Sequence, residues 1–239
     1  MNRLPLLAAL AVLSVPLAAG AEQPLVSDDA GVLGKGHGQL ELGMTRQPAG
    51  AQRTWETTLT YGLTDQTDVY VDTLYTNGGD SGSGWGDTEL GLKWRLAQYG
   101  PVSLMLKPGL MLPTGDRQRG LGTGRTGAGA TLVVQWESER FTLLGNARLI
   151  YQPNGQGQRQ SLWQISGAAL YHVTGQLQLA VDTVVARNPF PQSEKPPVFL
   201  IAGVIYSPQP WVELDIGYRH GLNGQADPHA VMAGLTVRW

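Results

Sequence analysis

The last eleven residues of the chain, HAVMAGLTVRW (229–239), decide its fold. Read backwards in steps of two, the apolar residues are Trp239, Val237, Leu235, Ala233 and Val231. The residues between them are mostly polar or small, and this period of two predicts a β-strand with one apolar face. An aromatic residue is unusual at the frayed terminus of a soluble protein, whereas in a bilayer it is an interfacial anchor.

Alternating segments of this kind recur about twelve times between residue 38 and the C-terminus. Short turns, such as 63–66 and 174–175, alternate with long loops, such as 77–84, 114–125 and 188–197. Short turns on one side and long loops on the other are typical of outer-membrane barrels. The sequence therefore predicts an all-β fold, an antiparallel transmembrane β-barrel of about 12 strands over residues 38–239, with both termini periplasmic.

Aromatic residues mark the end of every second predicted strand, next to its short turn. They are spaced by about one hairpin and are Tyr61, Trp94, Trp136, Tyr171, Tyr206 and Trp239. This spacing predicts a periplasmic aromatic girdle. A second group is expected to form the opposite girdle: Trp55, Tyr75, Tyr151 and Trp163. A soluble β-sandwich or a lipocalin-like barrel also alternates, but such folds have no reason to align aromatic residues at strand ends.

The composition and the N-terminus agree with an exported membrane barrel. Of 239 residues, 32 are glycine, 15% are charged and none is cysteine, and the net charge of −2 argues against a nucleic-acid partner. Residues 1–21 combine Arg3, an apolar run and an Ala19-Gly20-Ala21 cleavage site. They predict a signal peptide, with a signal anchor as the rival interpretation, and hence the Gram-negative outer membrane as the destination.

The opposite faces of the predicted strands carry charges of both signs. The residues expected to line the lumen are Asp72, Glu89, Lys93, Arg95, Lys107, Arg148, Asp182, Glu213, Asp215 and Arg219. Two interpretations stay open, a salt-bridge network that fills the lumen and a polar pathway for a solute.

Residues 22–37 precede the first predicted strand and show no alternation. They form either a mobile periplasmic leader or a short plug drawn into the lumen. In the plug, Asp28 and Asp29 would meet Lys93, Arg95 or Lys107, because buried carboxylates need cationic partners.

No residue pattern indicates catalysis, a metal site or a cofactor. The four histidines show no metal-ligand spacing, and no histidine lies beside a serine on the same strand face. The protein is therefore expected not to be an enzyme. An outer-membrane hydrolase, built from residues of neighbouring strands, is the least favoured alternative.

Three stretches resemble a known family: PLVSDDAGVLGKGHGQLELG (24–43), YGLTDQTDVYV (61–71) and LPTGDRQRGLGTGRTGAG (112–129). They are similar to the outer-membrane barrels described as "putative MetA pathway of phenol degradation", which look related to the barrel that secretes functional amyloid subunits. The resemblance implies a channel or transporter for small aromatic or hydrophobic solutes. The amyloid-secreting barrels carry an N-terminal coiled-coil extension, for which this chain has too short a leader.

The expected partners are outer-membrane lipid, a small-molecule solute and, through the C-terminal strand, the barrel-assembly machinery. A homo-oligomer is left open. The alternative function is a closed structural or interaction barrel whose long loops bind a partner.

Overall fold

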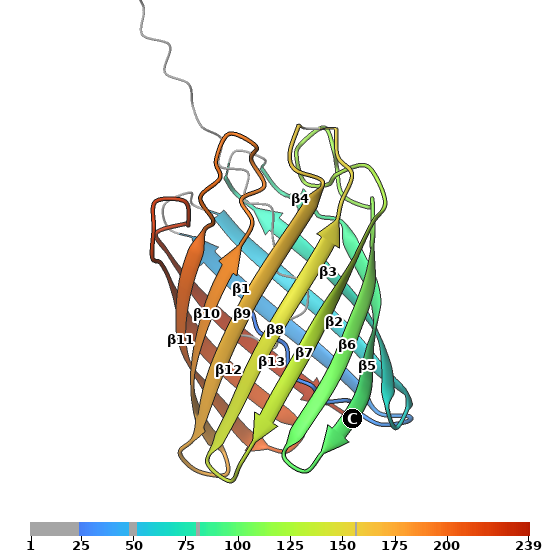
Figure 1. Cartoon of the computed structure of the whole chain (residues 1–239), viewed down its shortest axis with the longest axis vertical. Coiled ribbons are helices and arrows are strands. Elements are labelled where there is room, and N and C mark those ends of the chain that lie inside the picture. The colour runs from blue at the N-terminus through green and yellow to red at the C-terminus, as the bar shows by residue number, and fades with distance from the viewer. Residues whose placement is uncertain (1–23, 48–51, 80–81, 156) are drawn as a thin grey trace, which may run out of the picture.

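Residues 24–47, 52–79, 82–155 and 157–239 are described by the computed structural model, and the predicted signal peptide lies outside them. These residues form antiparallel strands tilted about a common axis (Figure 1). The strands are β1 Gly38–Gln47, β2 Gln52–Thr64, β3 Thr67–Asn77, β4 Gly84–Trp85, β5 Thr88–Tyr99, β6 Val102–Leu112, β7 Gly127–Glu137, β8 Phe141–Tyr151, β9 Ser161–His172, β10 Leu177–Ala186, β11 Val198–Gln209, β12 Val212–Gly221 and β13 His229–Arg238.

Pairing of the first strand with the last closes the sheet. β1 pairs with β2 on one side and with β13 on the other, so that the long strands form a closed antiparallel barrel of twelve strands. Closure matters because hydrocarbon offers no partner to an unpaired strand edge. The predicted fold class is therefore confirmed. No helix in the described part of the chain is long and apolar enough to cross a membrane.

One short strand was not expected from the sequence. β4 lies within and just after the predicted loop 77–84 and pairs with the end of β3. The Trp85 ring packs edge-on against the Tyr75 ring at a centroid distance of 5.2 Å. Two residues are too few to show a period, so alternation alone cannot reveal such a strand.

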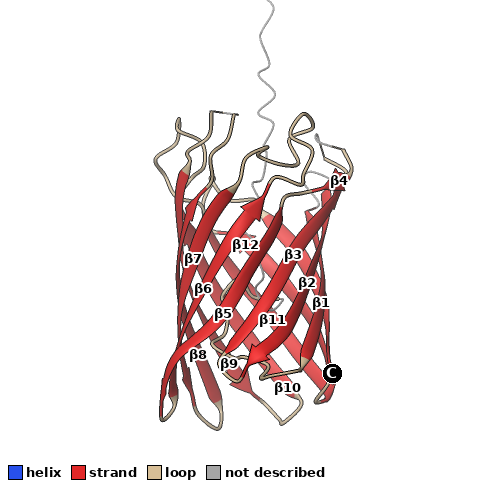
Figure 2. Cartoon of the chain, turned by 90° about the vertical axis from the view of Figure 1, so that its right-hand side faces the viewer, coloured by secondary structure: helices blue, strands red, loops and turns tan. Residues whose placement is uncertain are grey.

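The two ends of the barrel differ. Short turns gather at one end and long loops at the other, and the C-terminus lies at the short-turn end (Figure 2). The start of β1 lies there too, because Gly38 and Trp239 exchange two backbone hydrogen bonds of 2.9 and 3.0 Å.

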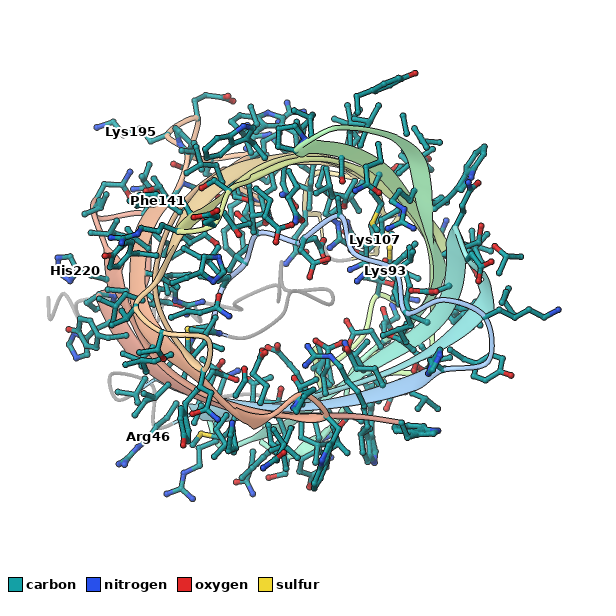
Figure 3. The ribbon with its side chains drawn as sticks, turned by 90° about the horizontal axis from the view of Figure 1, so that it is seen from below. Arg46, Lys93, Lys107, Phe141, Lys195 and His220 are labelled. Atoms are coloured by element: carbon teal, nitrogen blue, oxygen red, sulfur yellow. The ribbon has the colours of Figure 1, made fainter. Side chains whose placement is uncertain are left out.

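The barrel has the polarity of a membrane protein, with apolar side chains outside and polar ones inside (Figure 3). On β12, Leu214 and Ile216 point outward and are 45% and 58% exposed, whereas Glu213 and Asp215 between them are buried. The six predicted girdle aromatics are all exposed on the outer surface: Tyr61, Trp94, Trp136, Tyr171, Tyr206 and Trp239. Trp55 and Tyr151 are exposed too, and Tyr75 and Trp163 are partly exposed.

The Trp239 ring covers Gly38 on the neighbouring strand, where any Cβ would collide with it. We predict that Trp239→Asp impairs barrel assembly, because it places a charge at the girdle and uncovers the β1–β13 seam. The measurement is outer-membrane yield together with heat-modifiable gel mobility. Trp239→Phe, which keeps an aromatic ring, is the control. Equal yield and mobility for the Asp variant and the wild type would contradict the role of the seam.

Leu132 on β7 is 42% exposed on the outer face near the middle of its strand. We predict that Leu132→Arg lowers the free energy of unfolding by about 2–4 kcal/mol, because it moves a charge into hydrocarbon. Leu104→Arg, also on an outward position, is expected to act in the same direction. The control Ser103→Arg lies on the inward face of β6 and is expected to be tolerated. Urea unfolding in lipid vesicles measures both effects, and equal losses on the two faces would refute the face assignment.

Candidate functional site

The segment 24–36, called the leader below, lies inside the barrel along its wall (Figures 1 and 3). Its described contacts follow the wall from β11 and β12, through β10 to β5, to β3 and β2. The leader therefore lines most of the circumference of the lumen instead of extending away from it.

Asp182 on β10 is the main anchor of the upstream part of the leader. Its carboxylate accepts hydrogen bonds from the backbone N–H groups of Val26 and Ser27, both at 2.8 Å, and from the Ser27 hydroxyl at 2.9 Å. The Ser27 hydroxyl is also 2.8 Å from that of Ser166 on β9. Hydrogen bonds to a charged group contribute about 1.5–3 kcal/mol each, so this anchor holds the leader firmly.

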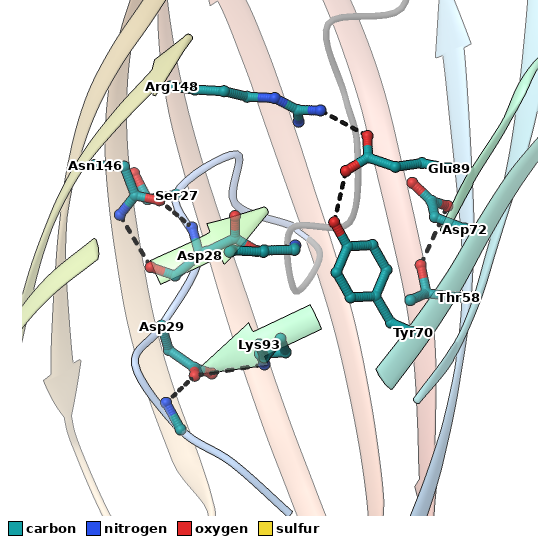
Figure 4. Close-up of polar contacts among 12 residues, drawn as sticks. Ser27, Asp28, Asp29, Thr58, Tyr70, Asp72, Glu89, Lys93, Asn146 and Arg148 are labelled. Carbon is teal, nitrogen blue, oxygen red and sulfur yellow. Dashed lines mark hydrogen bonds and ion pairs between the residues drawn. The ribbon is translucent and has the colours of Figure 1, made fainter. Parts of the chain in front are cut away.

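The next residue, Asp28, is bound by β6 and β8 (Figure 4). Lys107 on β6 lies 2.6 Å from the Asp28 carboxylate, and both side chains are almost fully buried. On β8, the Asn146 amide exchanges two hydrogen bonds with the Asp28 backbone, at 2.9 and 3.0 Å. A buried ion pair is stable only when its other polar atoms are satisfied, and Asn146 pairs the backbone beside it.

Asp29 and Lys93 of β5 form a looser ion pair, with Nζ 3.8 Å from Oδ1 (Figure 4). Both predicted acidic residues thus meet predicted lysines. Arg95 does not join them, because its guanidinium donates to the Asp65 carbonyl oxygen in the β2–β3 turn at 3.0 Å. Arg95 lies nearer the short-turn end of β5, below the acidic pair, which alternation alone cannot reveal.

Apolar contacts complete the upstream anchor. Pro24 fits over Gly203 and Gly217, where a Cβ would come within 2.5 Å of the proline ring. Leu25 packs into an apolar patch on the inner wall, made by Leu144, Ala168, Leu170, Ala180 and Ile205. These inward apolar residues depart from the expected polar lining, and the leader covers them.

The downstream part of the leader is held through its backbone. The Ala30 N–H donates to the Gln135 side chain at 2.8 Å, and the Leu33 N–H donates to Asp68 at 2.9 Å. The Gly36 N–H then donates to the Gly62 carbonyl oxygen at 2.9 Å, close to the start of β1. The barrel wall thus supplies acceptors to a segment that forms no secondary structure of its own.

A second polar cluster joins β3, β5 and β8 across the lumen (Figure 4). Glu89 accepts a hydrogen bond from the Tyr70 hydroxyl at 2.5 Å and pairs with Arg148 at 2.7 Å. Lys107 lies 4.7 Å from the centre of the Tyr70 ring, which links this cluster to the Asp28 contact.

The remaining predicted lumen residues lie closer to the β1–β13 seam. Glu213 is 3.6 Å from Arg238, and Arg219 is 3.6 Å from Asp227. Asp72 accepts a hydrogen bond from Thr58 at 3.2 Å. Asp215 is buried, and its Oδ1 has no hydrogen-bond partner among the residues that the structure describes.

Uncharged polar residues with inward side chains were missed as leader contacts: Asn146, Ser166 and Gln135. Each stands at an inward position of an alternating strand, so the period of two would have placed its side chain in the lumen. The period cannot say which inward residue lies at the depth of the leader, and only the pairing register does so.

The described geometry of the inner wall offers contacts to a peptide segment, the leader. Among the described residues, no three histidine, aspartate or glutamate side chains are placed to hold a metal ion. The exposed apolar band, the exposed aromatic residues at the strand ends and the closed barrel are those of a protein of the Gram-negative outer membrane.

Solved structures of outer-membrane barrels share this fold. The COG4313 outer-membrane channel from Pseudomonas putida F1 is similar with a TM-score of 0.64 and 17% identity, over 88% of this chain and 98% of that one. The NanC porin gives 0.61 and 11%, over 83% and 98%. The toluene transporter TodX of Pseudomonas putida gives 0.50 and 11%, over 85% and 88%. No curated protein matches the sequence.

The family model described as "Putative MetA-pathway of phenol degradation" matches residues 21–239, which is nearly the whole chain. The match spans both the leader and the strands that hold it. The chain therefore belongs to this family of barrels.

Proposed function

We propose that the protein is a passive outer-membrane channel for small solutes and that the leader is its plug. The observation that carries the proposal is the leader inside the lumen, held by side chains of β10, β8, β6 and β3. The leader has no secondary structure and is held by separate polar contacts. Its detachment from the wall therefore requires less free energy than the detachment of a barrel strand.

We propose small aromatic or hydrophobic molecules as the solutes. One structural observation supports this class besides the description of the family and the printed name of the toluene transporter. The inner wall carries an apolar patch beneath Leu25, and movement of the leader would expose it. Apolar surface inside an otherwise polar lumen is a binding surface for molecules with apolar parts.

A closed interaction barrel is the second candidate, and the lumen contacts favour it. The Glu89–Arg148 and Asp28–Lys107 pairs tie the wall to itself and to the leader. In a purely structural barrel such pairs fill the lumen permanently. Ion conductance separates the two candidates, because a permanently filled barrel conducts nothing.

The chain has no cysteine, so a single engineered disulfide can lock the leader. Ser27 and Ser166 bring their hydroxyl oxygens within 2.8 Å, which suits a bridge between Ser27→Cys and Ser166→Cys. We predict that single-channel conductance in planar bilayers is low in the oxidised double variant and rises when a reductant is added. Deletion of residues 24–36 is expected to raise it further, because the lumen is then clear.

The matched control pairs Ser27→Cys with Ser161→Cys, at the outward-facing start of β9, where no bridge can form. The conductance of this control should be the same before and after the reductant is added. Identical conductance and open fraction in the wild type, the locked variant and the deletion would rule out the plug. Liposome swelling with an uncharged aromatic solute and with a sugar of similar size then tests the solute class, and faster uptake of the sugar would contradict it.

A further inference from the structure

Carboxylates line the inner wall on both sides of the β1–β13 seam. The pairing register places Glu213 of β12 opposite Thr236, Thr236 opposite Glu41, and Glu41 opposite Thr58. The same row continues from Thr58 to Asp72 and from Asp72 to Glu89. Six neighbouring strands thus contribute four carboxylates and two threonines to one continuous inward row.

A second row runs beside the first. Asp215 of β12 lies opposite Gly234, Gly234 opposite Gly43, and Gly43 opposite Glu56. The two glycines leave the wall between the carboxylates without side chains. The Asp215 carboxylate lies directly over Gly234, where a Cβ would collide with it. The two rows together, Glu41, Glu56, Asp72, Glu89, Glu213 and Asp215, are called the acidic wall below.

The cations of the lumen form described ion pairs both with the acidic wall and with the leader. Arg148 pairs with Glu89, and Arg238 lies near Glu213. Lys107 and Lys93 instead pair with the leader through Asp28 and Asp29. Within the described residues, no lysine or arginine nitrogen lies within 4.0 Å of a carboxylate oxygen of Glu41, Asp72 or Asp215.

Asp215 shows the need for a cation most clearly. It is more than nine-tenths buried, it points into the lumen between the outward residues Leu214 and Ile216, and its Oδ1 has no described hydrogen-bond partner. Arg219, two inward positions further along β12, is turned to Asp227 and stacks on the Phe199 ring. Burial of a carboxylate without a partner is costly, and a mobile cation beside the carboxylate would offset part of that cost.

We propose that the acidic wall makes the lumen a cation-selective pathway, suited to solutes that carry an amine or another positive group. This inference rests on the proposed channel function and adds the charge of the solute to it. Acidic side chains gathered along a pore raise the local concentration of cations and exclude anions.

The test is the reversal potential of the full-length protein in planar bilayers under a KCl gradient. We expect K⁺ to be favoured over Cl⁻ by at least about threefold. The double variant Glu41→Gln, Asp215→Asn should lower that ratio at least about twofold with its conductance still measurable. Glu41→Asp keeps the charge and should keep the K⁺ to Cl⁻ ratio. Glu139→Gln removes a charge in the exposed β7–β8 turn and should leave the ratio unchanged.

The wild-type measurement decides the proposal even when the double variant fails to assemble. A ratio of one or below in the wild type overturns the inference while the channel function stands. An unchanged ratio in an assembled double variant overturns it as well. Absence of conductance in both the correctly folded wild type and the variant that lacks residues 24–36 contradicts the channel itself and the selectivity with it.

Discussion

Hydrocarbon cannot hydrogen-bond to a peptide group, and this constraint shapes the whole protein. It requires every long strand to have two neighbours. β1 and β13 are each other's second neighbour, and they pair at the seam under Trp239. It also directs apolar side chains outward, so that charged side chains occupy a narrow interior. Charges in such an interior need partners, and the leader supplies several of them through Asp28, Asp29 and its own backbone N–H groups.

The strands and faces could be predicted from the sequence because a period of two translates directly into side-chain direction. The same rule placed Asp182 and Lys107 on the inner surface and Trp94 and Trp239 on the outer one. The depth of a side chain depends on the stagger between strands, which no single strand encodes. For this reason Arg95 was one of three candidate partners of the acidic pair, although its guanidinium contacts the β2–β3 turn.

The contacts of the leader could be predicted only in part. Opposite charge suggested that Asp28 and Asp29 would meet lysines, and the structure brings these groups together. Other contacts are made by backbone N–H groups of the leader with Asp182, Asn146 and Gln135, and every residue type except proline carries such a group, so the sequence does not mark them. The acidic wall could not be predicted from the sequence either. Its carboxylates come from distant segments, and only the pairing register aligns them.

The central claim is that the leader occupies the lumen as a separable segment. Ser27 is 1% exposed, whereas Glu139 lies in an exposed turn, so cysteines at these two positions report on burial directly. The measurement is the rate at which a hydrophilic maleimide labels Ser27→Cys in the purified barrel, compared with Glu139→Cys. The account predicts labelling at least about tenfold slower at position 27, and faster labelling once Asp182→Ala removes the anchor. Equal rates at the two positions, unaffected by Asp182→Ala, would contradict it.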